Sequence, residues 1–436
     1  MRYYSTSDAS HTVPLEHAVL HGLAPGGGLY MPQTIAPLPE AFLRNLAAMS
    51  LPEIGYAVAN YALQGDVEAN ALHDIVTETL SFPIPLVEIA PGRYALELFH
   101  GPTMCFKDIG ARFMGRLLRY FHDRHYGWSD IHVLVATSGD TGAAVASGLL
   151  DVPGVRLTVL YPQEQISYAQ EAQFASLGRN VTALEVKGNY DDCKRLVAEA
   201  LLDGELTREL HLTTATTVNI ARLLPQTFYY FYAYAQLLAA GADTPQIVFS
   251  VPSANLGNLA SGLLAQRMGL PVKRFVSVEN RNNIFYNYIR TGRFTPRDSV
   301  YSIAPALDAG NPTNFPRITA LTGSHEQTCR DVHAYCFDDS DIAQTMRQVY
   351  ARHDYQFDPH SAIAWRGLEA DLGDGETGVS LATAHPGKFR TIVEDIMNRE
   401  IPLPASLARS LSAPRRVTTI TNGFNAFRRY LLSQAQ

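Results

Sequence analysis

One lysine stands where a loop gives way to a helix, and its surroundings could make its amine reactive. Lys107 follows Gly101 and Pro102, which interrupt regular structure, and precedes a segment whose apolar residues recur at helical spacing. An amine at such a place can form a Schiff base with an aldehyde when burial or neighbouring positive charge keeps it unprotonated. A lysine considered alone is usually a solvated surface residue, because a buried ammonium is costly. The apolar neighbours Phe106 and Ile109 favour the chemical interpretation.

Two later turns could bind anions beside this amine. Residues 138–142 and 253–258 each follow a short apolar run typical of a buried strand and precede a predicted helix. In an open α/β sheet, ligands bind beyond the carboxyl ends of the strands. Helix N-termini at that edge offer unpaired N–H groups and the positive end of a dipole. Each turn alone is also compatible with a purely geometric role. Together they predict one loop for a phosphate, one for a substrate carboxylate, and Lys107 between them.

A third turn and two histidines could also carry chemistry. Thr383 follows a predicted strand, where its hydroxyl could hydrogen-bond a heterocyclic nitrogen or simply cap the next helix. His385 and His360 could be general bases or metal ligands. Neither belongs to an H-E-x-x-H pattern, so ordinary structural histidines are favoured and no metal is expected.

Arg222 lies beside a hydroxyl-rich stretch at residues 213–217. The forked donors of a guanidinium match the oxygens of a phosphate ester. A surface ion pair explains the same arginine equally well, so both interpretations stay open.

Strands and helices alternate from Tyr94 onward, which predicts an α/β fold with doubly wound, mostly parallel sheets. The preceding residues suggest a separate helical lead-in, so the chain divides into 1–86 and 87–436, the latter with two α/β subdomains. The glycines at 26–28 could approach a phosphate, but no strand and helix flank them, and a surface loop is favoured. The expected strands are 131–136, 155–161, 181–186, 247–251, 272–278 and 378–384; the expected helices are 143–150, 166–177, 190–202, 219–240, 259–268 and 387–397.

Composition excludes several classes of protein. The chain has 436 residues, more than one compact core usually holds. Its net charge is -7 and it contains no run of lysine and arginine, which argues against nucleic acid as a partner. No apolar stretch approaches the length of a membrane span. Four scattered cysteines without a C-x-x-C pair, and no signal-like start, predict a cytoplasmic protein.

The segments named above, in this order along the whole chain, resemble the threonine synthases, pyridoxal-phosphate enzymes of the tryptophan-synthase-β-like fold. The lysine segment and the TSGDTG turn are the most specific parts of the resemblance. The other matching segments are Tyr3-Tyr4-Ser5-Thr6, the glycine-rich stretch that ends at Pro32, Tyr190-Asp191-Asp192-Cys193, Asn219-Ile220-x-Arg222-Leu223-Leu224, the turn that begins at Val251, and Thr383-Ala384-His385-Pro386-x-Lys388-Phe389.

The resemblance implies a cofactor, pyridoxal 5'-phosphate, and a role for each turn. Lys107 would form the Schiff base, and Thr383 would face the pyridine nitrogen and leave it largely unprotonated. Asn219 and Arg222 are candidates for the substrate phosphate. The substrate α-carboxylate would lie against Ser138, Gly139, Asp140 and Thr141; the cofactor phosphate would be held by Ser253, Ala254, Asn255, Leu256, Gly257 and Asn258.

The implied reaction converts O-phospho-L-homoserine and water to L-threonine and phosphate, the last step of threonine biosynthesis, with Lys107 as the general base. Partners other than this small molecule are not expected, and the chain would be a monomer or a homodimer. Two positions depart from the family: Ala254 replaces a common glycine, which would be strained if its φ were positive, and Thr216 replaces a frequent asparagine.

Four alternatives are considered. A serine/threonine dehydratase is disfavoured, because the whole-chain resemblance, lead-in included, is to the threonine synthases. A phospho-lyase of the same fold would release 2-oxobutyrate instead of threonine. A non-catalytic homologue would bind cofactor or metabolite without turnover. A dinucleotide-binding oxidoreductase shares the general fold class, but no G-x-G-x-x-G follows an early strand.

Overall fold

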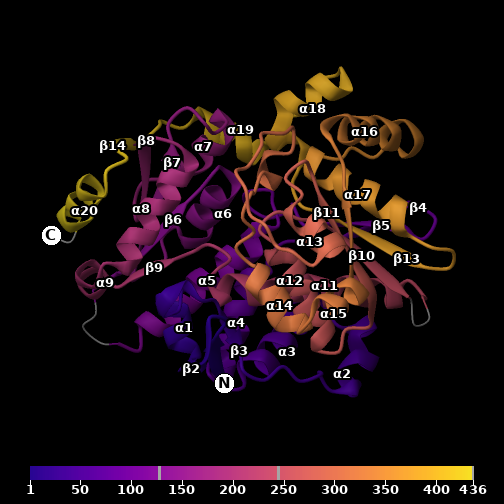
Figure 1. The fold of residues 1–436 in the computed structure, drawn as a ribbon, viewed down its shortest axis with the longest axis horizontal. Helices are drawn as coiled ribbons and strands as arrows, with labels where there is room; N and C mark the ends of the chain where they lie inside the picture. Colours follow the sequence, from indigo (N-terminus) through magenta and orange to yellow (C-terminus); the bar gives the residue numbers. More distant parts are fainter. Residues whose placement is uncertain (126–128, 243–245, 435–436) are drawn as a thin grey trace.

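Two mostly parallel sheets, each covered by its own helices, form the body of the protein. The computed structural model describes residues 1–125, 129–242 and 246–434. The five-stranded sheet has the order β14-β8-β7-β6-β9 and every pair in it is parallel. It lies on the left of Figure 1. Its strands are β6 (Ile131–Ala136), β7 (Val155–Pro162), β8 (Val181–Lys187), β9 (Leu212–Thr214) and β14 (Val417–Thr421).

The six-stranded sheet has the order β12-β11-β10-β13-β5-β4 and lies on the right of Figure 1. Its pairs are parallel except for β4, which runs antiparallel to β5 at the edge. Its strands are β4 (Leu86–Ala90), β5 (Arg93–Glu97), β10 (Ile247–Pro252), β11 (Val272–Glu279), β12 (Val332–Cys336) and β13 (Thr377–Ala382). These two mostly parallel sheets confirm the predicted α/β class.

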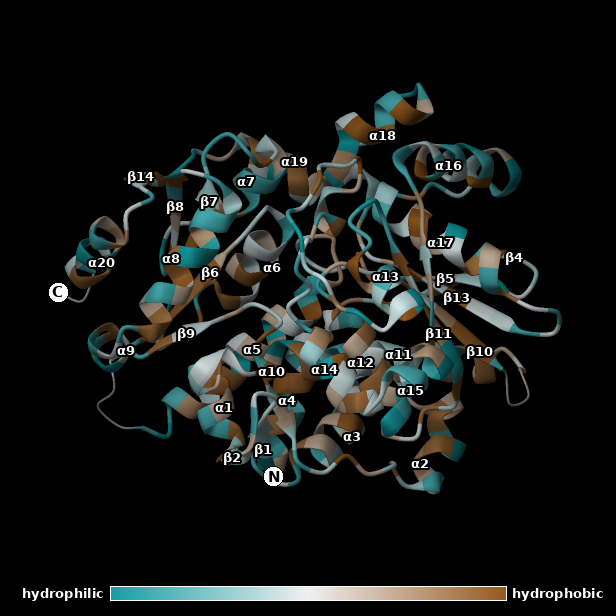
Figure 2. Ribbon diagram, in the orientation of Figure 1, coloured by the Kyte–Doolittle hydropathy of each residue, from teal (hydrophilic) through white to brown (hydrophobic). Residues whose placement is uncertain are grey.

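Helices cover both sheets, as continuous apolar strands require. All six residues of β6 and of β10 are buried. Figure 2 shows the hydrophobic colour along β10 and the hydrophilic colour on outer helices such as α16. The helices of this region are α5 (Lys107–His122), α6 (Asp140–Leu149), α7 (Tyr168–Ala175), α8 (Tyr190–Leu202), α9 (Gly204–Leu210), α12 (Gly257–Arg267), α13 (Ile284–Thr291), α14 (Phe315–Thr322), α15 (His325–Asp331), α16 (Asp339–His353), α17 (Pro359–Asp371), α18 (Arg390–Met397), α19 (Ala405–Ser412) and α20 (Phe424–Ser433).

The first eighty residues contain a sheet as well as helices, so the expectation of a helical lead-in was incomplete. Strands β1 (Arg2–Ser5), β2 (Asp8–Pro14) and β3 (Tyr30–Pro32) pair antiparallel in the order β2-β1-β3. The alternation of buried and exposed residues in β1 lasts only four positions, too few for a periodic signal. The helices are α1 (Leu15–His21), α2 (Glu40–Asn45), α3 (Leu51–Leu63) and α4 (Ala69–Thr79).

The long helix expected over 219–240 is interrupted. It consists of α10 (Ile220–Leu223), a 3₁₀ turn at Leu224–Gln226, and α11 (Thr227–Ala239). Pro225 lies in that turn and has no N–H to donate, so the ladder of hydrogen bonds stops there. On the N-terminal side of the break, α10 packs against α5, the helix that begins at Lys107.

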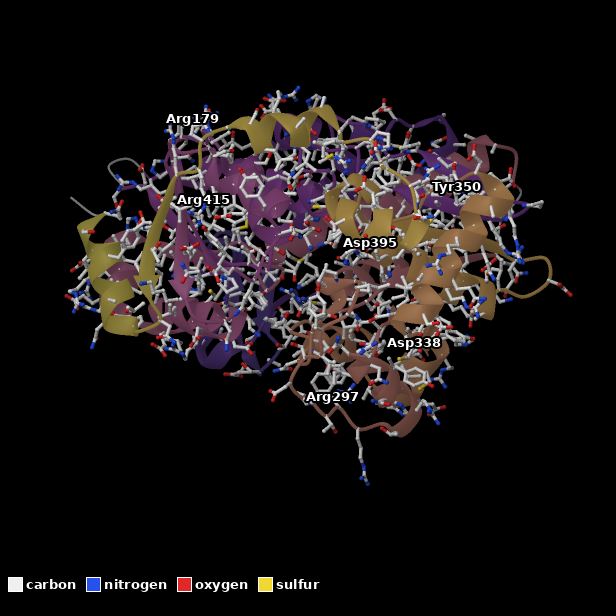
Figure 3. The ribbon with its side chains drawn as sticks, turned by 90° about the horizontal axis from the view of Figure 1, so that it is seen from above. Arg179, Arg297, Asp338, Tyr350, Asp395 and Arg415 are labelled. Atoms are coloured by element: carbon white, nitrogen blue, oxygen red, sulfur yellow. The ribbon has the colours of Figure 1, made fainter. Side chains whose placement is uncertain are left out.

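The C-terminal segment is tied to the five-stranded sheet by charge. Arg415, labelled in Figure 3, donates to Glu171 of α7 at 2.6 Å and to Glu185 of β8 at 2.7 Å. Strand β14 follows and extends the sheet beside β8. In the part of the chain that the structure describes, no helix has both the length and the apolar character needed to cross a bilayer.

Candidate active site

Three adjacent strands end at one edge of the six-stranded sheet and deliver most of the predicted site. Strand β13 lies between β5 and β10, with Ala382 opposite Glu97 and Ser380 opposite Ser250. The Lys107 loop follows β5, Thr383 follows β13, and the loop 253–258 follows β10. Because parallel strands place their carboxyl ends at one edge, these segments converge as the sequence predicted.

The Lys107 loop is fastened by its backbone to the segment that carries Thr383. The N–H of Phe106 donates to the carbonyl of Thr383 at 3.0 Å, and the N–H of His385 donates to the carbonyl of Met104 at 3.1 Å. On its other side, the N–H of Thr383 donates to Ser361 Oγ at 3.0 Å. The position of Thr383 relative to Lys107 is therefore set by main-chain bonds.

Lys107 is the first residue of α5, and its side chain reaches toward the second sheet. Its Nζ lies 4.0 Å from Asp140 Oδ2 and 5.5 Å from the centroid of the Phe106 ring. The side chain is 19% exposed, so the amine can be reached by a ligand while one face stays covered. Asp140 is buried at the start of α6, which follows β6 of the five-stranded sheet. This contact brings loops from the two sheets together.

Asp140 has a second, closer cation that sequence reasoning did not single out. Lys388 Nζ donates to Asp140 Oδ1 at 2.8 Å and to the carbonyl of Thr103 at 2.8 Å, with its side chain 1% exposed. Burial alone would raise the pKa of Asp140, but the ammonium groups of Lys388 and Lys107 hold it well below its usual range. The only signal in the sequence was the position of Lys388 in the motif that follows Thr383.

The loop 138–142 is held in a shape that only glycine permits. Gly139 has φ +136°, and a Cβ there would lie 2.4 Å from the side chain of Gln170. The N–H groups of Gly139 and Gly142 donate to Thr137 Oγ1 at 2.9 and 2.8 Å. Ser138 is exposed and Thr141 is partly exposed, so both can meet a ligand.

The loop 253–258 turns at Leu256, whose φ is +59°, and not at Ala254. Ala254 is absent from the residues with positive φ among those described, so alanine at this position is unstrained. The carbonyl of Asn255 accepts the N–H of Asn314 at 3.1 Å and its Nδ2 at 3.0 Å, which fixes the loop from outside. Helix α12 then begins at Gly257 with N–H groups that have no intrahelical acceptor.

Asn258 contributes a buried donor without a partner. Its Oδ1 accepts the hydroxyls of Tyr229 and Tyr230, each at 2.7 Å, whereas its Nδ2 is buried and makes no hydrogen bond. A buried unpaired donor is costly unless a ligand satisfies it. At a helix N-terminus, the acceptor that fits is an anion.

Asn219 and Arg222, predicted to bind a substrate phosphate, are buried, and both donate to backbone carbonyls. The Nε of Arg222 is buried and makes no hydrogen bond, so the role of these residues at the substrate phosphate stays a prediction. The amide nitrogen of Asn219 donates to the carbonyls of Val19 and Thr214 at 2.8 and 3.3 Å. The guanidinium of Arg222 donates to the carbonyl of Ala215 at 2.6 Å and reaches that of Lys107 at 3.5 Å.

The two histidines considered from the sequence have structural partners. His360 Nδ1 lies 2.6 Å from Asp358, and its Nε2 accepts the N–H of Ala306 at 3.1 Å. His385 Nδ1 accepts the N–H of Gly387 at 3.0 Å, and burial lowers the pKa of His385. No group of three or more potential metal ligands occurs among the residues that the structure describes.

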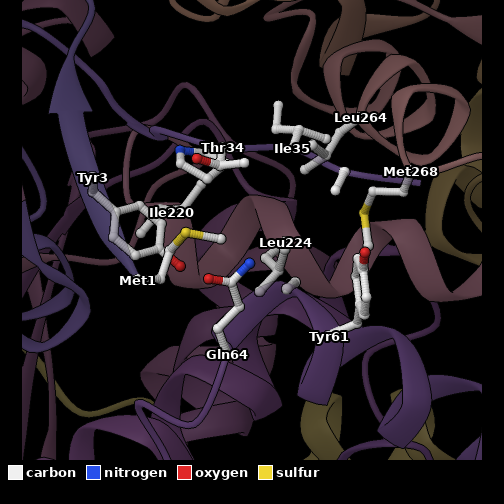
Figure 4. A pocket seen from close by; sticks show the side chains of 13 residues that line it. Met1, Tyr3, Thr34, Ile35, Tyr61, Gln64, Ile220, Leu224, Leu264 and Met268 are labelled. Atoms are coloured by element: carbon white, nitrogen blue, oxygen red, sulfur yellow. The ribbon is translucent and has the colours of Figure 1, made fainter. Parts of the chain in front are cut away.

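A separate pocket lies where the N-terminal sheet meets the helices behind the site. Figure 4 shows it lined by Tyr3, Tyr61, Ile220, Leu264 and Met268 among others. None of its lining residues is a predicted site residue, so this pocket is not the site described above.

Comparisons with known proteins agree with this geometry. The family model "Pyridoxal-phosphate dependent enzyme" matches residues 84–384, "Threonine synthase N terminus" matches 2–80, and "Threonine synthase, C-terminal" matches 361–431. The threonine synthase of Haemophilus influenzae is 36% identical over 432 residues, covering 99% of this chain and 100% of that protein. The crystal structure of threonine synthase from Escherichia coli superposes with a TM-score of 0.93 at 34% identity and full coverage of both chains. The PLP-bound threonine synthase from Brucella melitensis does so with a TM-score of 0.93 at 30% identity, again with full coverage.

The fold and the lysine-centred site thus define a pyridoxal-phosphate-dependent enzyme of fold type II. Within that class, the chain belongs to the threonine synthase family, and its cofactor is pyridoxal phosphate.

The residues present fit that cofactor. The unpartnered Nδ2 of Asn258 and the free N–H groups at the start of α12 suit a phosphate group. Lys107, partly exposed and fastened beside Thr383, suits an aldehyde carbon and a ring nitrogen.

Proposed function

We propose that the substrate is O-phospho-L-homoserine and that the chain converts it with water to L-threonine and phosphate. The observation that supports this most is the contact between the two sheets, where Lys107 lies 4.0 Å from Asp140 of the second anion-binding loop. A reaction on the carbon chain of an amino acid needs the amine of Lys107 beside the loop that binds the substrate α-carboxylate. The contact between Lys107 and Asp140 brings that amine and that loop together.

Each site residue has a proposed task. When bound, pyridoxal phosphate supplies an electron sink for negative charge at the substrate α-carbon. The loop 253–258 would hold its phosphate, and the hydroxyl of Thr383 would donate a hydrogen bond to its ring nitrogen. Ser138 and Thr141 would orient the substrate carboxylate by hydrogen bonds, which aligns the α-carbon with the amine. Gly139, whose N–H donates to Thr137 Oγ1, would shape the loop around that carboxylate.

Lys107 is the proposed general base. Its Nζ takes the proton from the substrate α-carbon, and the same nitrogen can carry protons from Cβ and to Cγ, because all three carbons belong to one short chain beside it. The covered face of the lysine limits the water that can compete for these protons.

Other predictions from the sequence stay proposals. These are the division into residues 1–86 and 87–436, the cytoplasmic location, and the state of monomer or homodimer. The assignment of Asn219 and Arg222 to the substrate phosphate also stays a proposal, and the buried Nε of Arg222 is a donor without a partner.

The test is a stopped assay of the cofactor-loaded protein with O-phospho-L-homoserine, in which phosphate, L-threonine and 2-oxobutyrate are measured together. Equal amounts of phosphate and threonine support the proposal. Phosphate with 2-oxobutyrate would identify a phospho-lyase, and no phosphate at all would favour a homologue that binds without turnover.

A further inference from the structure

Lys388 is enclosed in the site, yet the reaction described above gives it no task. Its ammonium contacts Asp140 Oδ1 at 2.8 Å, whereas the Nζ of Lys107 lies 4.0 Å from the other oxygen of that carboxylate. One buried carboxylate therefore faces two amines, and the contact with Lys388 is the shorter.

Asp140 creates two electrostatic problems where it lies. Its loop is proposed to receive the substrate carboxylate, which a bare negative charge would repel. Its carboxylate also faces the amine of Lys107, and a lone anion at that distance would favour the protonated, unreactive ammonium. A second cation that never takes part in bond formation would remove both problems.

We propose that Lys388 is the permanent counter-ion of Asp140, so that Lys107 Nζ is free to react and the loop 138–142 can accept an anion. Lys388 acts through Asp140 and is therefore a positioning residue. The part that concerns the substrate carboxylate rests on the proposed function. The part that concerns Lys107 does not, because it requires only the protein and its cofactor.

Lys388 is fixed by the same backbone ties that fix Thr383. It lies in a 3₁₀ turn (Pro386–Phe389) whose preceding residue, His385, donates its N–H to the carbonyl of Met104. The N–H of Lys388 donates to the carbonyl of His385 at 3.0 Å. The ammonium of Lys388 is therefore held in one place even if the loop 138–142 moves, and it stabilises one position of the Asp140 carboxylate.

The other charged groups around the pair do not offer an alternative counter-ion. Asp108 accepts the N–H and the hydroxyl of Thr103, and burial raises the pKa of Asp108. Burial also raises the pKa of the Cys105 thiol. On α10, the two terminal nitrogens of Arg222 donate to backbone carbonyls and its buried Nε has no partner; among the described residues Arg222 forms no ion pair with Asp140.

Burial by itself would lower the pKa of Lys388, but the contact with Asp140 raises it above its usual range. The contact with Asp140 thus favours the charged form of Lys388, which a counter-ion requires. Gln170 supports the same arrangement, because its Nε2 donates to Asp140 Oδ1 at 3.2 Å.

The test is a pH titration of the visible absorbance of the cofactor-loaded, full-length protein without substrate. The variants are Lys388→Met, Lys388→Arg and the double variant Lys388→Met with Asp140→Asn. The control is Lys273→Met, which removes another lysine–carboxylate contact, the one with Glu376 at 2.7 Å. If Lys388→Met does not fold, Lys388→Gln replaces it, because glutamine retains a donor for the carbonyl of Thr103.

We expect Lys388→Met to raise the midpoint of the titration by about one to three pH units, since an unopposed carboxylate at this distance stabilises the positive charge on the lysine nitrogen. Lys388→Arg and the control should have titration midpoints close to that of the wild type. In the double variant, the midpoint should return most of the way to the wild-type value. An unchanged midpoint in Lys388→Met, or an equal shift in the double variant, would overturn the proposal.

A second readout uses the protein without cofactor. Lys107 is labelled with formaldehyde and borohydride at pH 7, and its modification is quantified by mass spectrometry. Lys388→Met should slow this labelling about tenfold or more relative to Lys273→Met, and equal rates would contradict the proposal. Neither experiment contains O-phospho-L-homoserine, so a wrong substrate would show in the product assay and leave these results intact.

Discussion

The backbone N–H of Phe106 donates to the carbonyl of Thr383 at 3.0 Å, although the two residues are 277 positions apart in the chain (383 minus 106). The bond joins the residue before the reactive lysine to the residue whose hydroxyl is proposed to face the ring nitrogen of the cofactor. The two segments proposed to hold opposite ends of the cofactor ring are thus joined by a main-chain hydrogen bond. Rigid support of this kind is what precise positioning of a reactive group requires.

Replacement of Lys107 should abolish covalent attachment of the cofactor. We expect Lys107→Ala to lack the visible absorbance of the lysine-bound cofactor and to lose activity, because alanine has no amine to react with the aldehyde. Absorbance spectra and the mass of the borohydride-reduced protein measure this. Lys273→Ala should keep both signals. A variant that retained the visible band would show that another amine holds the cofactor.

Thr383 should act through its hydroxyl. Thr383→Val removes the hydroxyl at nearly constant volume and should lower kcat on the order of tenfold, with a smaller change in KM, because a hydrogen bond to the cofactor ring contributes about 1 kcal/mol. Thr383→Ser keeps the hydroxyl and should retain most of kcat. Steady-state kinetics of the two variants give the comparison, and equal losses in both would point to the methyl group and to packing.

Replacing Gly139 should distort the loop 138–142. Its φ of +136° is rarely adopted by residues with a side chain. A Cβ added at this position would also lie 2.4 Å from the side chain of Gln170. Gly139→Ala should therefore destabilise the fold by about 1–3 kcal/mol and raise KM for the amino-acid substrate. Gly375→Ala is the matched control, since it has φ +75° with nothing within 4 Å of its Cβ. A KM that rises equally in the control would show that strain alone is responsible.

Much of the fold was predictable because the strands of parallel sheets are short apolar runs. The expected strand at 131–136 coincides with β6, and the expected helix at 190–202 coincides with α8. The same periodicity argument failed over 219–240, where Pro225 divides the helix, and at β1, where four residues are too few to show alternation. Local pattern is informative only where an element is long enough to repeat it.

The site was less predictable because its geometry depends on contacts that no local pattern contains. Lys107 and Asp140 come together only because two separate sheets place their loops opposite each other. Lys388 belongs to a segment that resembles the family, but the sequence assigned it no role, since a lysine in a short turn is usually solvated. Arg222 is a mixed case. Backbone carbonyls accept from its two terminal nitrogens, while its buried Nε has no partner, so its role at the substrate phosphate stays a prediction.

Asn258 should control affinity for the cofactor. Asn258→Asp keeps an oxygen for the hydroxyls of Tyr229 and Tyr230 but replaces the unpartnered Nδ2 with negative charge. We expect the dissociation constant for pyridoxal phosphate to rise by at least about tenfold. Ala254→Gly should leave that constant within about twofold, because Ala254 does not adopt a positive φ. Fluorescence titration of the cofactor-free protein measures both, and a large gain in Ala254→Gly would show that alanine does strain the loop.

The stability of the protein should fall in mild acid partly because of one buried histidine. His132 lies in β6 with its Nε2 2.8 Å from Thr158 Oγ1, and burial, reinforced by the positive charge of Arg156, lowers the pKa of His132 from 6.5 to about 4. Between these two pKa values the unfolded chain binds more protons than the folded one. The contribution of neutral His132 to the free energy of unfolding is therefore fully present above pH 6.5 and declines as the pH falls toward 4. The shift corresponds to at most about 3 kcal/mol.

The difference between two variants isolates this contribution, because all other titrating groups are common to them. His132→Gln removes the titration, and its stability should decline less between pH 6.5 and pH 4 than that of the wild type. His353→Gln changes an exposed histidine and should follow the wild-type curve. Denaturant unfolding at a series of pH values measures the free energies. Parallel curves for the wild type and His132→Gln would mean that protonated His132 is accommodated in the folded sheet.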